Sequence, residues 1–137
     1  MARTASWTAL ESLEARTLLA FITWDGGGGD SDWNNPLNWS GDALPGAADN
    51  VLIDSPGHAT IHRSADVADT IASLWTLNPL DISAGSLTVN GSWRQSAPLF
   101  VSGGSVHSTG NILVNGDVLW IAGAIDGGGN ILVYPGR

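Results

Sequence analysis

Hydrophobic residues recur at a regular spacing between residues 80 and 133. Leucines at 80, 99 and 119 begin three similar segments, and an aliphatic residue follows two positions after each of them. The tetrapeptide Asn-Ile-Leu-Val occurs twice, at 111–114 and 130–133. The resulting period of 19 to 20 residues is too short for a repeating pair of helices. It suits one coil of a β-solenoid, in which short strands stack on the coil below.

Apolar and polar residues alternate within each segment, and this alternation predicts which side chains face the interior. We expect strands at 51–53, 59–61, 71–74, 80–83, 86–89, 99–102, 105–108, 112–114, 119–122 and 131–133. Asn-Gly and Gly-Gly pairs between them supply corners, because glycine adopts left-handed conformations readily. The interior ladders are expected to contain Leu80, Ile82, Leu87, Val89, Leu99, Val101, Val106, Ile112, Val114, Leu119, Ile121, Ile125, Ile131 and Val133.

Trp120 is the position at which the repeat is ambiguous. A strict 19-residue register places Trp120 on Val101 inside the solenoid, whereas a slip of one residue places it beside Phe100 on the surface. We favour the slip because it keeps small aliphatic side chains inside. Phe100 and Trp120 would then form an exposed aromatic pair suited to a sugar ring or a neighbouring segment, unless later chain covers that face. In a second outward column, His107 and Asp126 are one coil apart, about 4.8 Å between strands, which allows their side chains to touch; we interpret this column as a solvated face.

Residues 22–54 differ from the repeats because three tryptophans lie among Gly, Asn, Asp and Pro. Turn-forming residues of this kind exclude one long helix or strand. We interpret the block as a cap that covers the exposed edges and apolar interior of the first coil with large aromatic side chains. The alternative is that Trp24, Trp33 or Trp39 stacks on carbohydrate.

The same block carries oxygen-bearing side chains of the type that bind Ca²⁺, namely Asp25, Asp30, Asp32 and Asn34. The run GGGGDSDW at 26–33 is similar to a Ca²⁺-binding nonapeptide repeat, but it is one residue out of register and occurs once. We therefore expect a chain without a cofactor, with calcium as the alternative that these residues allow.

Residues 1–21 predict a short helix. Thr8 and Glu11 form the pattern of a capping box, and leucines at 10, 13 and 18 mark one face. The following apolar run is shorter than the core of a secretory signal. Residues 10–20, LESLEARTLLA, resemble the LEPR-XLL motif found at the start of very large bacterial surface and secreted proteins, although Ser12 replaces the usual proline.

A second resemblance covers residues 22–54 and continues into residues 51–89. The block is similar to the W-x-G-G…W…N-W…P…D-x-V-x-I segment that opens many bacterial β-helix domains in adhesin-like and autotransporter-like proteins. The matching residues are Trp24, Gly26, Gly27, Trp33, Asn38, Trp39, Pro45, Asp49, Val51 and Ile53. Together the two resemblances imply a right-handed parallel β-helix at a cell surface or in the secreted fraction.

Composition narrows the function classes further. The formal charge is −8 and all five cations are arginine, so such a chain should repel nucleic acid and anionic membrane. No stretch is long enough to cross a membrane, and without cysteine there is neither a disulfide nor a thiolate metal site. Aspartates at 66, 69, 81, 117 and 126 are spread over several coils, and Arg63 and Arg94 form no cluster. A glycosidase needs converging carboxylates, so we expect no enzyme.

These observations predict an all-β, right-handed parallel β-helix with a short N-terminal helix and a Trp-rich cap. We divide it into an export- or sorting-type segment at 1–21, the cap and first strand at 22–54, and coils at 55–137, which we expect to be truncated at the C-terminus. The expected function is a non-catalytic structural or adhesive module, the N-terminal part of a large secreted or cell-surface protein. The alternative is the N-terminal cap of a β-helix polysaccharide lyase or glycoside hydrolase whose catalytic coils are missing. Expected partners are further coils of a longer chain or a second copy, and surface polysaccharide.

Overall fold

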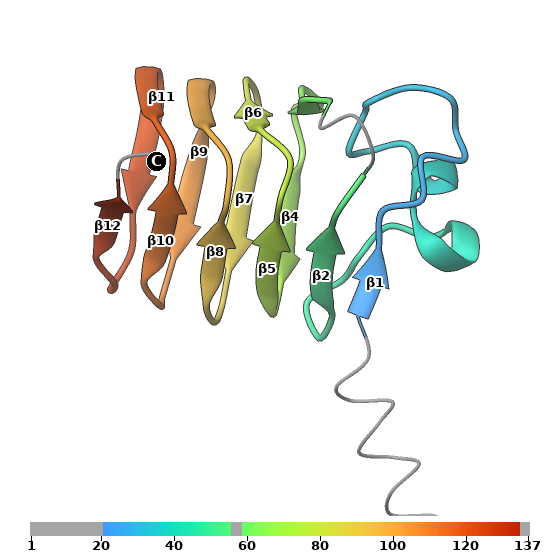
Figure 1. Cartoon of the computed structure of the whole chain (residues 1–137), viewed down its shortest axis with the longest axis horizontal. Coiled ribbons are helices and arrows are strands. Elements are labelled where there is room, and N and C mark those ends of the chain that lie inside the picture. Colours follow the sequence, from blue (N-terminus) through green and yellow to red (C-terminus); the bar gives the residue numbers. More distant parts are fainter. Residues whose placement is uncertain (1–20, 56–58, 135–137) are drawn as a thin grey trace, which may run out of the picture.

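The protein is a parallel β-solenoid of about four turns (Figure 1). The computed structural model describes residues 21–55 and 59–134. Six strands form the front sheet of Figure 1, in the order β1 (Phe21–Thr23), β2 (Asn50–Ile53), β5 (Ser73–Thr76), β8 (Trp93–Gln95), β10 (Ile112–Asn115) and β12 (Ile131–Tyr134). The back sheet contains β3 (Ile61–Arg63), β4 (Ala68–Ile71), β6 (Leu80–Ile82), β7 (Ser86–Val89), β9 (Leu99–Ser108) and β11 (Val118–Asp126).

Every strand pair within these sheets is parallel, and the register repeats the spacing seen in the sequence. Leu80 pairs with Leu99, and Leu99 pairs with Val118, one coil of 19 residues at each step. Parallel neighbours need a crossover connection, and the remainder of each coil provides it. The 19-residue repeat is therefore confirmed as the structural unit.

The core is the interior of the solenoid, between the two sheets. Alternate residues of each strand point inward, so one row contains Ile61, Leu80 and Leu99, each 1% exposed or less. Leu87 and Val106 form a second row across the interior. Predicted ladder residues from position 80 to position 114 are confirmed as buried, whereas Ile125 is partly buried against the core.

Several predicted strand limits were wrong. The strand expected at 59–61 begins at Ile61, and the strand expected at 71–74 is two strands that meet at a corner at Ala72. The pieces at 99–102 and 105–108 join into the single strand β9, which pairs with β6 through its first half and with β7 through its second. Strands β1 and β8 were not predicted. The helix expected within residues 1–21 lies outside the described residues.

The preferred register slip at Trp120 was also wrong. Trp120 pairs with Val101 and Leu119 pairs with Phe100, as the strict 19-residue repeat requires. The irregularity comes immediately after Trp120, where Ala122 pairs with Ser102. Val118 and Trp120 therefore continue the interior rows, and the predicted inward positions of Leu119 and Ile121 do not hold.

Candidate functional site

Three tryptophans close the N-terminal end of the solenoid. Trp24 and Trp33 each pack edge-on against Trp39, with ring centroids 5.1 and 4.9 Å apart. The indole Nε1 of Trp39 donates a hydrogen bond of 2.7 Å to the carbonyl oxygen of Trp33. Trp24 is 8% exposed, and Trp33 and Trp39 are 0% exposed. No ring face remains for stacking, so their burial argues against the predicted carbohydrate contact of Trp33 and Trp39.

Asp30 organises the loop that precedes the cap tryptophans. Its carboxylate accepts hydrogen bonds from Asn38 Nδ2 at 2.7 Å and from Asn35 Nδ2 at 3.1 Å, and from the backbone N–H of Asp32. These donors, that of Asn38 first, lower the pKa of Asp30 because they favour the charged carboxylate. The ionised carboxylate of Asp30 thus joins three parts of the loop through hydrogen bonds.

The other predicted calcium ligands face different partners. Asp25 Oδ1 accepts from the backbone N–H of Gly27, and Asp32 Oδ1 accepts from that of Asn34. Asn34 points away from the loop and donates its Nδ2 to Asp69 at 2.9 Å. Across residues 21–55 and 59–134, no group of three or more His, Asp or Glu side chains is arranged to hold a metal ion. The structure does not bring the four residues together as one coordination site.

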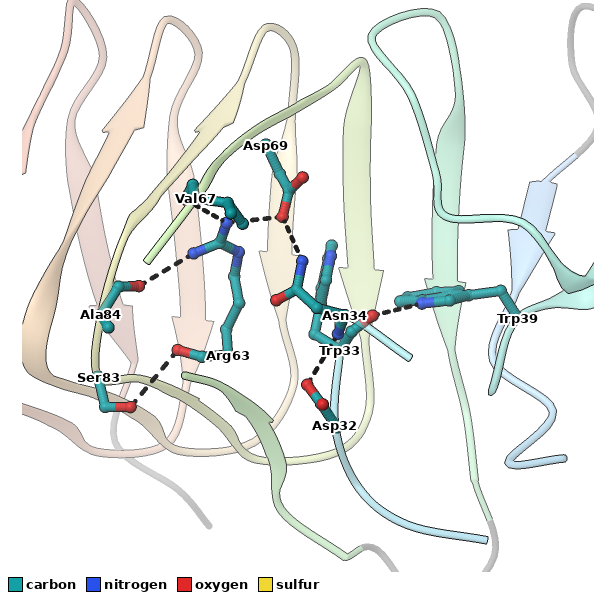
Figure 2. Close-up of polar contacts among 9 residues, drawn as sticks. All are labelled: Asp32, Trp33, Asn34, Trp39, Arg63, Val67, Asp69, Ser83 and Ala84. Atoms are coloured by element: carbon teal, nitrogen blue, oxygen red, sulfur yellow. Dashed lines mark hydrogen bonds and ion pairs between the residues drawn. The ribbon is translucent and has the colours of Figure 1, made fainter. Parts of the chain in front are cut away.

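An ion pair lies inside the first coil, next to the cap. Arg63 follows Ile61 by two positions in β3 and so points inward, and its row continues with Ile82 in the next coil. Asp69 occupies the row of Leu87 in the same way. Arg63 Nη2 lies 2.6 Å from Asp69 Oδ2, and the Arg63 side chain is 0% exposed (Figure 2).

The guanidinium of Arg63 also binds backbone carbonyls. It donates to the oxygen of Val67 at 2.9 Å and to that of Ala84 at 3.1 Å, and Asn34 reaches the same carboxylate from below (Figure 2). A buried charge needs this combination of an opposite charge and hydrogen bonds. We did not predict from the sequence that Arg63 and Asp69 form a pair. The inward position of Arg63 does follow from the sequence, because Arg63 lies two residues after Ile61.

The outward columns of the back sheet do not form the predicted aromatic pair. Phe100 is half-buried beside Leu119. Trp120 is 55% exposed and donates its Nε1 to the carbonyl oxygen of Gly123 at 3.0 Å. The structure therefore does not bring Phe100 and Trp120 together as a platform, because Phe100 points to the outer face of the sheet and Trp120 occupies the row of Val101 on its inner face.

Two histidines of the back sheet contact aspartates on its outer face. His107 Nδ1 lies 2.6 Å from Asp126 Oδ1, a contact that their spacing allowed, and His62 Nδ1 lies 3.4 Å from Asp81 Oδ2. Ser102 Oγ donates to the other oxygen of Asp81 at 2.8 Å. A nucleophilic serine needs a histidine as its immediate base, whereas here the carboxylate lies between the two groups. This arrangement does not activate Ser102.

No helix in residues 21–55 and 59–134 is both long and apolar enough to cross a membrane. Comparison of the chain with protein-family models, with curated proteins and with solved structures found no match.

Proposed function

We propose that this chain is a non-catalytic structural and adhesive module of a large β-helix protein that is secreted or held at a cell surface. The coil is taken to be right-handed, because nearly all parallel crossover connections are. The observation that carries the proposal is the difference between the two ends of the solenoid. The end at β1 is sealed, whereas the end at β11 and β12 presents an apolar face.

The open end has the properties of a contact surface. Seven large hydrophobic residues of β11 and β12 are each more than a third exposed: Leu119, Trp120, Ile121, Ile131, Leu132, Val133 and Tyr134. Ile131 and Val133 continue the rows of Ile112 and Val114, which are 2% and 0% exposed. A face of this kind marks an interaction site. Its proposed partners are further coils or a second copy of the chain.

The lack of a catalytic constellation among the described residues is compatible with a structural role. Asp69 is committed to Arg63 inside the first coil, and Asp81 and Asp126 are each committed to a neighbouring histidine. The outer faces of the two sheets carry hydroxyl, amide and a few aromatic side chains that repeat from coil to coil. Repeated side chains of this kind suit many weak contacts with another molecule.

Sedimentation equilibrium tests the contact face. The wild-type chain should show an average mass that rises with concentration, and the variant Ile121→Lys/Val133→Lys should remain monomeric. The matched control is Leu37→Lys/Val67→Lys, which changes two hydrophobic residues of comparable exposure elsewhere on the surface. This control should associate as the wild type does.

A wild-type chain that stays monomeric at every concentration would rule out this face as a contact surface. Location is tested separately with an antibody against the folded chain. Intact producing cells, or their medium, should react with it. A reaction that appears only after lysis contradicts the proposed location.

A further inference from the structure

A shallow depression of about 560 Å³ lies on the outer face of the front sheet. It crosses β5, β8 and β10, the strands at the centre of that sheet in Figure 1, and Phe21 of β1 also lines it. Its principal side chains are Ser73, Trp75, Ser92, Arg94, Asn111 and Leu113. The depression has no part in the cap or in the apolar open end, and no acidic residue lines it.

The strand register arranges these side chains in two rows along the solenoid axis. Trp75 pairs with Arg94, and Arg94 pairs with Leu113, which forms one row. Ser73, Ser92 and Asn111 lie two positions earlier in each coil and form the second row; Ser73 begins β5, and Ser92 and Asn111 immediately precede β8 and β10. Neighbouring members of a row are about 4.8 Å apart, the spacing of adjacent strands. A linear ligand lying along the axis would meet a polar group at each coil.

Glycine corners keep one side of the depression open. A Cβ on Gly91 would lie 2.6 Å from the carbonyl oxygen of Ala72, and one on Gly110 would lie 2.5 Å from that of Gly91. The backbones of successive coils therefore pack too closely here for any side chain. As a result the hydroxyl of Ser92 and the amide of Asn111, which follow these corners, are reached directly from solvent.

Arg94 supplies the charge of the depression. Its guanidinium carbon lies 5.3 Å from the centroid of the Trp75 ring. Among residues 21–55 and 59–134 the Arg94 side chain makes no ion pair or hydrogen bond, whereas Arg63, the other arginine described, binds Asp69 and two backbone carbonyls through its Nη atoms. Stacking on an aromatic ring fixes the guanidinium plane and leaves its N–H groups free at the edge, where they match a carboxylate in a two-pronged geometry.

We propose that this depression binds an acidic saccharide, with Arg94 holding the carboxylate of a hexuronic acid unit. Trp75 and Leu113 offer apolar surface to the sugar ring. The side chains of Ser73, Ser92 and Asn111 form hydrogen bonds with the hydroxyl groups of the saccharide. Ser73 Oγ already donates a hydrogen bond to Asn50, and its lone pairs can accept one from the ligand. A chain of charge −8 repels anions in general, so measured binding of a uronate reports the local action of Arg94.

This inference deepens the adhesive role proposed above and rests on it. Isothermal titration of the whole chain with short oligomers of a hexuronic acid tests it, with the methyl esters of the same oligomers as the neutral probe. Hydrogen bonds to charged groups correspond to at least about a tenfold change in affinity. Methyl esterification and Arg94→Gln should each weaken binding by at least that factor. Arg94→Lys should not restore it, because lysine lacks the planar fork.

Two further variants complete the test. Trp75→Ala should weaken binding, and Val67→Ala, which shortens an exposed hydrophobic side chain outside the depression, should leave it unchanged. Absence of binding by the acidic oligomer, equal binding of its ester, or an unchanged affinity of Arg94→Gln would overturn the proposal. Equally tight binding of a short peptide with a free C-terminal carboxylate would overturn the saccharide class. If the chain associates through its open end but does not bind the uronate oligomers, this inference is refuted and the proposed function is not.

Discussion

Removal of the Asp69 carboxylate by Asp69→Leu should be among the most damaging single changes in this protein. Arg63 has no exposed surface, and its strongest contact is the 2.6 Å ion pair with Asp69. Without the carboxylate, a buried positive charge would keep only two carbonyl oxygens as partners. Breaking a buried pair from one side costs about 3–5 kcal/mol. The equilibrium constant for folding would then fall by about two to four powers of ten.

The double variant Arg63→Met/Asp69→Leu is the decisive comparison. The next coil has Ile82 and Leu87 in the same two rows, so apolar residues can continue the interior packing. Replacement of a buried ion pair by apolar residues of similar size is often neutral or stabilising. The backbone oxygen of Val67 also accepts from Ser86 N–H, so it is not left without a donor. We expect the double variant to recover most of the stability lost by Asp69→Leu.

Urea denaturation followed by far-UV circular dichroism gives these free energies. The wild type, Arg63→Met, Asp69→Leu and the double variant form a double-mutant cycle. Asp66→Leu is the matched control, because it removes the same charge from an exposed position on the connection between β3 and β4. Its effect should stay within about 0.5 kcal/mol. If Asp69→Leu were no more destabilising than Asp66→Leu, or if the double variant were worse than either single one, the reasoning would be refuted.

Three further changes test other parts of the structure. Val101→Asp should cost about 4 kcal/mol or more, because it buries an unpaired carboxylate, whereas His107→Ala should be nearly neutral; denaturation midpoints in the reverse order would contradict the interior rows. Trp39→Ala should cost about 3–5 kcal/mol and reduce the near-UV dichroism of the cap, an outcome that an unchanged spectrum would exclude. The contribution of Asp30 should be complete above the ordinary aspartate pKa of about 3.9 and lost as the pH falls through its lowered folded pKa. Asp30→Asn should therefore unfold with a shallower acid dependence, and identical pH profiles would count against this role.

The repeat could be predicted from the sequence because apolar residues alone define it. Side chains such as Leu80, Leu99 and Val106 recur at a fixed spacing, and their burial requires the same backbone course at every coil. Alternation then assigns the inward face without any knowledge of the neighbouring strand. The confirmed interior rows from position 80 to position 114 rest on this argument.

The alternation of apolar and polar residues did not predict strands that place polar side chains inside the solenoid. Strand β8 was missed because Arg94 and Gln95 suggest an exposed segment. Gln95 is nevertheless buried, since it accepts from Trp93 Nε1 and donates to the carbonyl oxygens of Asn78 and Pro98. Asn78 is 17 residues away in the chain, and the alternation of apolar and polar residues does not show that Gln95 finds hydrogen-bond partners inside the solenoid.

The candidate sites were harder to predict than the fold. Trp33 lies among Gly, Asp and Asn, and this context is the same whether its ring covers a core or faces solvent. The sequence alone therefore did not show that Trp33 is buried. The register at Trp120 depended on whether the irregularity comes before or after this residue. Only the strand pairing decides that, since both choices keep an alternating pattern.

The sealed end has a consequence for the symmetry of any assembly. A head-to-tail fibre needs two different complementary faces on each molecule. Here the face opposite β11 and β12 is covered by indole rings and closed from within by Arg63 and Asp69. If two copies associate through β11 and β12, as proposed above, they would meet through the same face, and a two-fold axis would lie between them. Such a pair would cover the edge strands that could otherwise template an open filament.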